Sequence, residues 1–475
     1  HLVAFGVVVD LVQSGVLADV GVVLSCNPVL CGLVNRTDPG YELRQGETVV
    51  GGGVVEDDVR YAAGFSAGPG ERRGRADGRI VRLVVRPHCP SCTSCPFARE
   101  VLADDLDQGL DVFDLGLASA VALWIVRCGC GVLGAVGMSP EQLEKELKWI
   151  DDHIDGKPYG VDVLIPNKMI GRDEKFDAEK LVAMIPQEYA DFRADVLENN
   201  DIEASELRTI DTGGSGFAAN TQSGGAKALL DVAFNHPIKL IANALGVPPD
   251  WMLQMGKDND VKVAALLGTA QHAINQVKAG VDILVVSGTE AGGHCGSVPT
   301  MILIPEVHEA IQPYGDVPIL AAGGIVTGKQ MAAAMSMGAS GAWCGSVWLT
   351  TIESEVDPVI KEKMIAANSS QTVRSRSRTG KHSRQLQSTW TDAWESDKAP
   401  EPLPMPLQPM VAEPALQKVN KLAAGGHEGA QDLATYWVGQ GVGLMNQSIS
   451  ASDVVQDFKE DFIGAYERMS GFFEE

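Results

Sequence analysis

His294 lies in a stretch whose composition could support catalysis, GTEAGGHCG at residues 288–296. A run of β-branched residues, VDILVVS at 281–287, precedes this stretch and predicts a strand. The imidazole of His294 is the one side chain here that exchanges protons near neutral pH, so it is a candidate general base. Gly292 and Gly293 would let a flat ring or a phosphate lie against the backbone. Because a single histidine is more often structural, this stretch alone leaves both roles open.

Two neighbours of His294 carry reactive groups as well. Cys295 could act as a nucleophile, but no separate base follows at a readable spacing, so we expect a small packing residue. Glu290 could be a second acid, or it could fix the loop by accepting N–H hydrogen bonds, and we favour the second role.

Two later loops have the composition of a phosphate site. They are AAGGI and CGS, and their candidate contacts are Gly323, Gly324, Gly345 and Ser346. Glycine lets backbone N–H groups approach an anion closely, and the helix expected from about Thr327 points its positive end the same way. Two such loops favour a phosphorylated cofactor or substrate over simple tight turns.

A cysteine cluster nearer the N-terminus has part of a metal-binding pattern, HCPSCTSCP. Cys89, Cys92 and Cys95 have the spacing of a partial iron–sulfur run, and His88 could complete a zinc set. No second Cys-x-x-Cys pair follows, and adjacent His88 and Cys89 make awkward co-ligands. We therefore predict no metal site.

The elements that must position these loops alternate between strand and helix from about residue 130. Seven apolar segments predict strands, at residues 131–137, 159–166, 238–246, 261–268, 281–288, 318–324 and 341–349. Strands that are apolar on both faces and separated by helices indicate a parallel sheet covered by helices. Their spacing favours a TIM-type β/α barrel. A doubly wound open sheet is the alternative, weakened by the lack of an early G-x-G-x-x-G.

In such barrels the active site lies at the C-terminal ends of the strands. We place GTEAGGHCG on the strand two before AAGGI, so His294 and the phosphate loops should share one face. The barrel is expected at residues 109–353, with a helical insertion over its mouth at about 167–237. Residues 354–475 read as a helical C-terminal cap, and 1–108 as an atypical N-terminal extension.

Composition limits the classes of partner. Hydrophobic residues are 45% of the chain and charged residues 21%, as in globular proteins. The net charge of −24 argues against nucleic acid and anionic membranes as partners. Nine cysteines cannot all pair within the chain, which favours a reduced, cytoplasmic protein. No stretch reads as a signal peptide or a membrane span.

The late segments also resemble a known family. The pairing of GVDILVVSGTEAGGHCGSVPTMILIPEV with DVPILAAGGIVTGKQMAAAMSMGASGAWCGSVWL is similar to the nitronate monooxygenases, formerly called 2-nitropropane dioxygenases. GVLGAVGMSPEQLEKELKWIDDHIDGKPYGVDVLIP and TWTDAWE are similar to one bacterial branch of this family, and the resemblance covers about residues 131–469.

The resemblance implies a barrel that binds FMN. The FMN phosphate would lie on the glycines of AAGGI and CGS and on Ser346, with the flavin ring near Gly292 and Gly293. His294 matches the catalytic histidine, which would act as base where a neutral nitroalkane must lose a proton. The substrate would be an alkyl nitronate or nitroalkane, converted with oxygen into a carbonyl compound and nitrite. No metal is implied, and the oligomeric state is left open.

Other functions remain open at this point. FMN-dependent enoyl-acyl carrier protein reductases and NADH:quinone reductases have a similar loop, so a reductase that uses NAD(P)H is one alternative. An inactive barrel that binds ligands or partners is another. A lysine that some members place near the flavin is replaced here by leucine, at about Leu266 or Leu267.

The N-terminus departs from the family pattern. Members begin with an apolar first strand, but Leu110–Cys128 occupies its place without resembling it. A genuine extension and a shifted reading frame upstream of about residue 130 both explain this, and the abrupt start of the likeness favours the second.

Overall fold

The computed structural model describes residues 48–50, 53–55, 130–167, 169–170, 177–212 and 215–473. The chain divides into two units, Leu24–Val112 in one and His1–Val23 with Phe113–Glu475 in the other. In the first unit, β1 (Thr48–Val50) pairs antiparallel with β2 (Gly53–Val55). The predictions for the cysteine cluster and for the segment at 110–128 lie outside the described residues.

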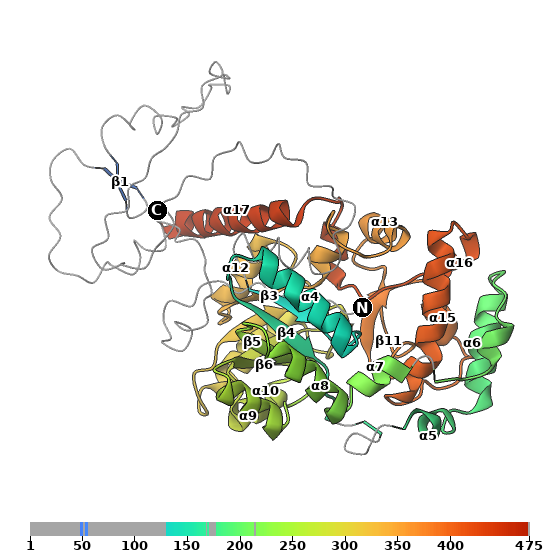
Figure 1. Cartoon of the computed structure of the whole chain (residues 1–475). Helices are drawn as coiled ribbons and strands as arrows, with labels where there is room; N and C mark the ends of the chain where they lie inside the picture. The colour runs from blue at the N-terminus through green and yellow to red at the C-terminus, as the bar shows by residue number, and fades with distance from the viewer. Residues whose placement is uncertain are drawn as a thin grey trace, which may run out of the picture. The chain divides into compact units, whose positions relative to one another are not determined.

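Seven parallel strands form the central sheet (Figure 1). They are β3 (Gly131–Gly134), β4 (Tyr159–Val163), β5 (Leu240–Asn243), β6 (Lys262–Leu267), β7 (Ile283–Ser287), β9 (Ile319–Ala322) and β10 (Gly341–Trp343). All seven predicted strands are confirmed. Their order in the sheet follows the chain without reversal, which excludes the doubly wound alternative and gives the TIM-type arrangement.

One predicted position in this sheet is wrong. The GTEAGGHCG loop follows β7, and β7 pairs directly with β9, whose end is the AAGGI loop. The two loops are therefore on neighbouring strands, not two strands apart. The reason is that the helix between them, α11 (Thr300–Ile311), returns the chain to the adjacent place in the sheet.

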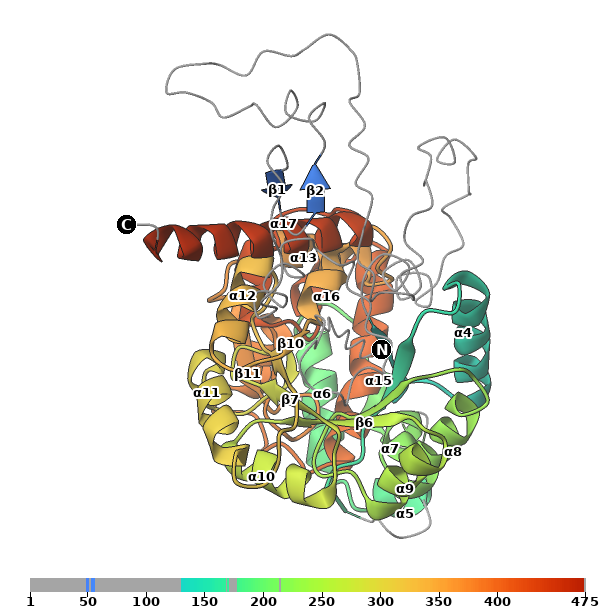
Figure 2. The ribbon, with the colours of Figure 1, turned by 90° about the vertical axis from the view of Figure 1, so that its left-hand side faces the viewer.

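Helices cover the outside of the sheet (Figure 2). Apolar side chains fill the inside. The outer helices besides α11 are α4 (Pro140–His153), α8 (Ser223–Ala233), α9 (Asp250–Asp258), α10 (Ala270–Ala279) and α12 (Gly328–Ser336). A capping box begins α4, since the Gln142 N–H donates to Ser139 Oγ at 3.2 Å and the Ser139 N–H donates to Gln142 Oε1 at 2.8 Å. Leu143, Leu147 and Ile150 form its buried face.

The insertion and the C-terminal segment share one hydrophobic core. The insertion contributes α5 (Ala178–Val182), α6 (Gln187–Glu198), η4 (Ser205–Arg208) and α7 (Ser215–Asn220). From the C-terminal segment, α13 (Pro358–Ala366), α14 (Thr389–Trp394), α15 (Leu407–Ala424), α16 (Glu428–Leu433) and η6 (Gln440–Leu444) contribute to this core, and η5 (Ser346–Thr350), which precedes the segment, adds Leu349. The segment ends with α17 (Ala451–Ser470), which packs against α12, and η7 (Gly471–Phe473). Asn220 Nδ2 donates to the carbonyls of Val136 and Met138, so α7 is anchored at the C-terminal end of β3.

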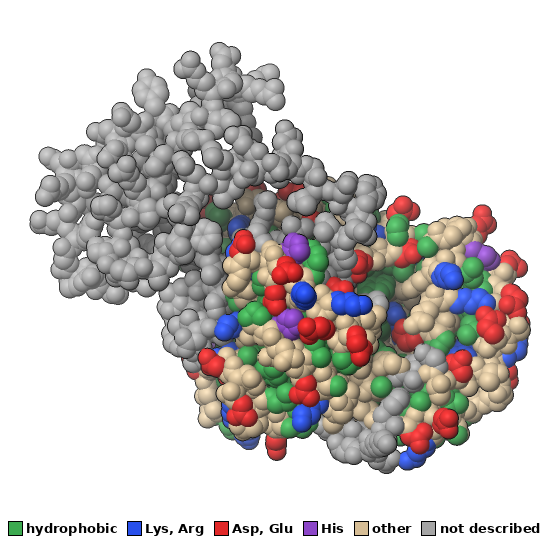
Figure 3. Space-filling model, in the orientation of Figure 1, with side chains coloured by type: hydrophobic (Ala, Val, Ile, Leu, Met, Phe, Trp, Pro, Cys, Tyr) green, Lys and Arg blue, Asp and Glu red, His purple; other side chains and the backbone are tan. Residues whose placement is uncertain are grey.

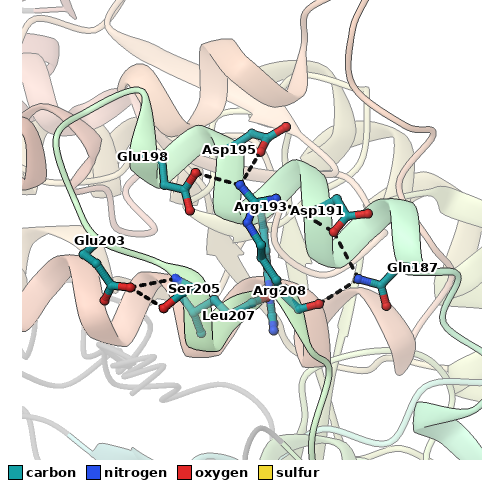
Figure 4. A network of polar contacts seen from close by, with 9 residues as sticks. All are labelled: Gln187, Asp191, Arg193, Asp195, Glu198, Glu203, Ser205, Leu207 and Arg208. Atoms are coloured by element: carbon teal, nitrogen blue, oxygen red, sulfur yellow. Dashed lines mark hydrogen bonds and ion pairs between the residues drawn. The ribbon is translucent and has the colours of Figure 1, made fainter.

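Two arginines hold α6 and η4 of the insertion together (Figure 4). Buried Arg193 donates to the carbonyls of Leu207, Thr209 and Val411, which satisfies its guanidinium without a paired acid. Arg208 lies on the surface and contacts three carboxylates one helical turn apart on α6, those of Asp191, Asp195 and Glu198. The first arginine ties α6 to α15, because Val411 belongs to α15.

A β-hairpin from the C-terminal segment reaches back to the histidine loop. Its strands β11 (Thr372–Ser375) and β12 (Ser383–Leu386) pair antiparallel, and β12 also pairs with β8 (Gly293–His294). Ser383 lies opposite His294, and Arg384 lies opposite Gly293. The basic stretch RSRSRTGKHSR therefore forms the tip and edge of a three-stranded sheet that holds His294.

The described surface is mixed in charge. Figure 3 shows acidic, basic and apolar side chains interspersed over the face that it presents. Within the described ranges, no helix has the length and apolar content needed to cross a membrane.

Candidate active site

A cavity opens at the C-terminal ends of the strands. It holds about 1040 Å³ of space when its opening to solvent is included. All seven predicted site residues line it: Gly292, Gly293, His294, Gly323, Gly324, Gly345 and Ser346. The barrel brings them together because neighbouring parallel strands end at the same edge.

The AAGGI loop has a conformation that requires glycine. Gly323 and Gly324 have φ of 102° and 74°, a region that other residues rarely adopt. A Cβ on Gly323 would lie 2.9 Å from Thr300 Oγ1. The cap of α12 holds the loop from the other side, since Gln330 Nε2 donates to the Gly324 carbonyl at 2.7 Å. In the described part of the chain, the N–H groups of Gly323, Gly324 and Gly345 donate to no protein oxygen, so they remain available to an anion.

Glu290 fixes the histidine loop, as the sequence suggested. Its carboxylate accepts the Thr300 N–H at 2.9 Å and the Thr300 hydroxyl at 2.9 Å. The same hydroxyl lies 3.0 Å from the Gly323 carbonyl. Glu290 and Thr300 thus hold the two glycine loops together. Because its carboxylate is bonded to Thr300, Glu290 is not placed to act as a general acid.

The CGS loop contacts Gly439 of the C-terminal segment, a contact that the sequence did not predict. Ser346 Oγ accepts the Gly439 N–H at 2.8 Å, and the Gln440 N–H donates to the Glu290 carbonyl at 2.9 Å. A Cβ on Gly292 would lie 2.8 Å from the Gly439 nitrogen, so only glycine fits there. The Ser346 hydroxyl keeps its own proton, with which it can still donate to a phosphate oxygen.

Among the described residues, the His294 ring has one hydrogen-bond partner, Thr379 at the tip of the hairpin. His294 Nε2 lies 2.8 Å from Thr379 Oγ1, and that hydroxyl lies 3.2 Å from the Lys381 carbonyl. When the hydroxyl donates to the carbonyl, it accepts the proton of Nε2 and leaves the lone pair on Nδ1. Burial, helped by the charge of Lys381, lowers the pKa of His294 to about 4. The ring is therefore neutral near pH 7, the state in which it can accept a proton.

Sequence reasoning missed Thr379. It is fully buried and lies 85 residues along the chain from its histidine partner. The only available signal was the pattern of two short alternating runs around a Thr-Gly turn, which predicts a hairpin but not its neighbour.

Sequence reasoning also missed an aromatic wall formed by the C-terminal segment. Tyr436 and Trp437 line the cavity, and the Arg378 guanidinium lies 3.5 Å from the centre of the Trp437 ring. Arg378 in turn pairs with Glu413 through Nε at 2.7 Å and Nη2 at 3.2 Å. This ion pair is buried and holds the indole in place by a cation–π contact.

Asp162 on β4 is a third residue that the sequence analysis did not select. It points to the inside of the barrel, lines the cavity and is 6% exposed, and its Oδ1 has no hydrogen-bond partner. Burial raises the pKa of this carboxyl well above its ordinary value. The available signal was a charged residue at an inward position of an otherwise apolar strand, YGVDV.

Replacing Asp162 with Asn should make the cofactor-free protein more stable at high pH. The folded state holds a proton that the unfolded carboxyl releases above its ordinary pKa, so the stability of the parent falls as pH rises through that window. Asn is isosteric and does not ionise. In thermal unfolding between pH 4.5 and 8, the gain of Asp162→Asn over the parent should grow with pH. The exposed control Asp231→Asn should show no such trend, and a pH-independent gain for Asp162→Asn would contradict the assignment.

The lining of the cavity fits a flat, polar group with a phosphate. Three buried polar atoms on its wall have no partner in the part of the chain that the structure describes, namely Asp162 Oδ1, Trp343 Nε1 and Trp437 Nε1. Such atoms are rare in folded proteins unless a ligand or water satisfies them. Leu266 also lines the cavity. Among the described residues, no group of His, Cys, Asp and Glu side chains is arranged to hold a metal ion.

Comparison with known families gives one clear match. The sequence model described as nitronate monooxygenase matches residues 114–461. The matched region begins at residue 114, whereas the sequence analysis predicts a resemblance from about residue 131. Part of the segment at residues 110–128 therefore does resemble the family. A family model compares the whole length of the chain, so it detects weaker similarity than a comparison of a few short motifs does.

Individual relatives agree with this match. A Mycobacterium tuberculosis protein named as a monooxygenase is 49% identical over 345 residues, which cover 72% of this chain and 90% of that protein. A Bacillus subtilis protein named as a probable nitronate monooxygenase is 27% identical over 243 residues, 49% of this chain and 67% of that protein.

Solved structures show the same fold. A nitroalkane oxidase from Streptomyces ansochromogenes superimposes with a TM-score of 0.59 at 23% identity, covering 74% of this chain and 93% of that one. FabK from Thermotoga maritima gives a TM-score of 0.53 at 24% identity, covering 75% of this chain and 90% of that one.

Proposed function

This chain belongs to the nitronate monooxygenase family and is an oxidoreductase, and from that premise we propose that it uses FMN to oxidise alkyl nitronates with oxygen to a carbonyl compound and nitrite. One observation carries the proposal. His294 lies on the wall of the same cavity as two glycine loops whose N–H groups have no protein acceptor among the described residues. A proton acceptor and an anion-binding site therefore line the same cavity.

The residues around the cavity can hold FMN. The N–H groups of Gly323, Gly324 and Gly345, with the Ser346 hydroxyl, would bind its phosphate through charge-assisted hydrogen bonds. When bound there, FMN supplies the electron transfer that no protein side chain can perform. Gly292 has no side chain to block a flat ring, and Trp437 and Trp343 offer unpartnered N–H donors on the same wall.

His294 would then work on the substrate in two ways. Towards a neutral nitroalkane, the unprotonated ring nitrogen would take the proton from the carbon next to the nitro group. Towards a preformed nitronate no proton has to move, and the ring would only donate or accept a hydrogen bond. Thr379 is a positioning residue, because its contact with Nε2 fixes which nitrogen carries the lone pair.

Replacing Thr379 with Val should lower kcat/KM for a neutral nitroalkane about tenfold, the usual effect of one lost hydrogen bond. Valine keeps the shape but removes the hydroxyl that orients His294. Nitrite release, followed over a range of pH, measures the loss. Thr379→Ser keeps the hydroxyl and should restore most of the activity. If Ser and Val behave alike, the hydroxyl does not position the base.

Purified protein tests the whole proposal. Flavin absorbance bands and release of FMN on denaturation are expected, together with nitrite release from the nitronate of 2-nitropropane in air without NADH. Consumption of NAD(P)H with an enoyl thioester or a quinone, and no nitrite, would instead assign the reductase activity. A protein that neither binds flavin nor releases nitrite would be an inactive barrel.

A further inference from the structure

The C-terminal half of α17 lies on the surface without burying any residue. The first half of the helix is held by Val454, Val455 and Phe458, which are buried, and the helix packs against α12. After Phe458 no residue of the helix is buried, and its end extends beyond α12 (Figure 2). Phe472, just after the helix, is 71% exposed. A helix end that projects with a large apolar side chain indicates an interaction surface.

One side of α17 carries residues at the spacing of a helix–helix contact. In steps of four and three residues, this stripe consists of Val454, Phe458, Asp461, Ala465, Arg468 and Phe472. Two helices pack side by side with this heptad spacing. The middle of the stripe allows a close approach, because Ala465 and its neighbour Gly464 are small and a Cβ on Gly464 would meet nothing within 4 Å.

A pocket lies beside the N-terminal half of this stripe, between α17, η6 and the cap of α12. It holds about 770 Å³ of space when its opening is included. Its apolar walls include Val326, Val347, Leu444, Val454 and Phe458, and its acidic walls are Asp457, Glu460 and Asp461. Among the described residues no lysine or arginine lines it. The pocket is therefore suited to an aromatic side chain that arrives together with a cation.

Charge is separated along α17. Burial raises the pKa of Asp457, and the neighbouring carboxylates, with Glu460 first among them, act in the same direction. Asp461 has a lysine partner, the exposed Lys329. Arg468 lies two turns further on, and no carboxylate of the described residues lies within ion-pair distance of it. One half of the stripe thus has excess negative charge, and the other half has an unpaired cation.

We propose that α17 pairs antiparallel with the α17 of a second copy of this chain, about a two-fold axis near Gly464. This register places Asp461 opposite the second copy's Arg468, and the symmetry repeats the ion pair on the other side of the axis. Phe472 then lies opposite Asp457, at the pocket of the second copy. The same surface supplies both the pocket and the side chain that fills it, as a two-fold contact requires. This self-complementarity favours a second copy over an unrelated protein.

The contact would also touch a segment that supports the active site. Val326 follows the AAGGI loop and lines both this pocket and the active-site cavity. Thr327, the next residue, caps α12 with Gln330, whose Nε2 donates to the Gly324 carbonyl. Phe472 of the second copy would pack against this segment. The dimer itself does not depend on the proposed function.

Two variants with opposite changes of charge test the register. Arg468→Asp and Asp461→Arg each place like charges opposite one another across the axis, so each variant alone should sediment as a monomer where the parent is a dimer. An equal mixture of the two variants restores both ion pairs and should form a heterodimer. Sedimentation of one fluorescently labelled variant, with and without the other, measures this. A defect within one chain, such as loss of the Lys329 pair, cannot be repaired by mixing.

The apolar part of the contact has its own test. Phe472→Ser should raise the dissociation constant of the dimer at least about tenfold, since each copy loses one buried aromatic side chain. Met301→Ser removes an exposed apolar side chain outside α17, and Glu467→Arg changes a charge on the other side of α17. Both controls should dimerise like the parent, and thermal unfolding checks that every variant is folded.

Three results would overturn the proposal. One is a parent that sediments as a monomer at every concentration. Another is a dimer that is weakened equally by Phe472→Ser and by the two controls. The third is a mixture of the two charge variants that stays monomeric while the parent dimerises, because the interface would then lie elsewhere on the molecule.

Discussion

Replacing His294 with Asn is expected to lower turnover of neutral nitroalkanes by about 10²- to 10⁴-fold, the usual contribution of a general base. Asparagine can still form a hydrogen bond in this place but cannot accept a proton at neutral pH. Turnover of a preformed nitronate should therefore fall by less than about tenfold, since only a hydrogen bond is altered. Nitrite release from 2-nitropropane and from its nitronate, measured on the same preparation, gives the comparison.

The pH dependence adds an independent check on His294. Burial and Lys381 lower the pKa of its ring to about 4, so the free protein keeps the base unprotonated above that pH. In the parent, kcat/KM for a neutral nitroalkane should fall only as the pH drops towards 4, and this limb should be missing in His294→Asn. Equal losses on nitroalkane and nitronate would contradict the role as base and leave a binding or structural role.

Replacing Gly323 with Ala is expected to abolish FMN retention and to lower the stability of the cofactor-free protein by about 2–5 kcal/mol. About 1–2 kcal/mol comes from forcing a side chain into a positive φ, and about 1–3 kcal/mol from overpacking. The new Cβ would lie 2.9 Å from Thr300 Oγ1 and 3.1 Å from the Ala291 nitrogen. The clash would separate the loop from Thr300, which joins it to Glu290.

Gly280→Ala is the matched control for Gly323→Ala. Gly280 ends α10 with φ of 90°, and a Cβ there would meet nothing within 4 Å. This variant should lose only the roughly 1–2 kcal/mol of the backbone term and should keep its flavin. The flavin-to-protein absorbance ratio and thermal unfolding measure both effects. Full flavin content in Gly323→Ala would show that the AAGGI loop does not hold the phosphate.

Much of the barrel could be predicted because its signals are local. Each strand is a short apolar run, and the glycine loops come directly after strands. The cap of α4 depends on Ser139 and Gln142, which are three residues apart. One general rule, that parallel strands end at the same edge, then places His294 beside the glycine loops. The error was to place the two loops two strands apart. The predicted strands at 281–288 and 318–324 are consecutive along the chain, and they pair directly in the sheet.

The sequence by itself determined the fold class, the seven strands and the cluster of glycines around His294, since these depend on periodicity and chain order. Only the tertiary structure decided what surrounds that cluster. Thr379 and Trp437 come from a C-terminal segment that is distant along the chain, and Asp162 is buried by the strands and loops that surround it. Contacts of this kind depend on which surfaces meet after folding, and no local pattern of residue types records them.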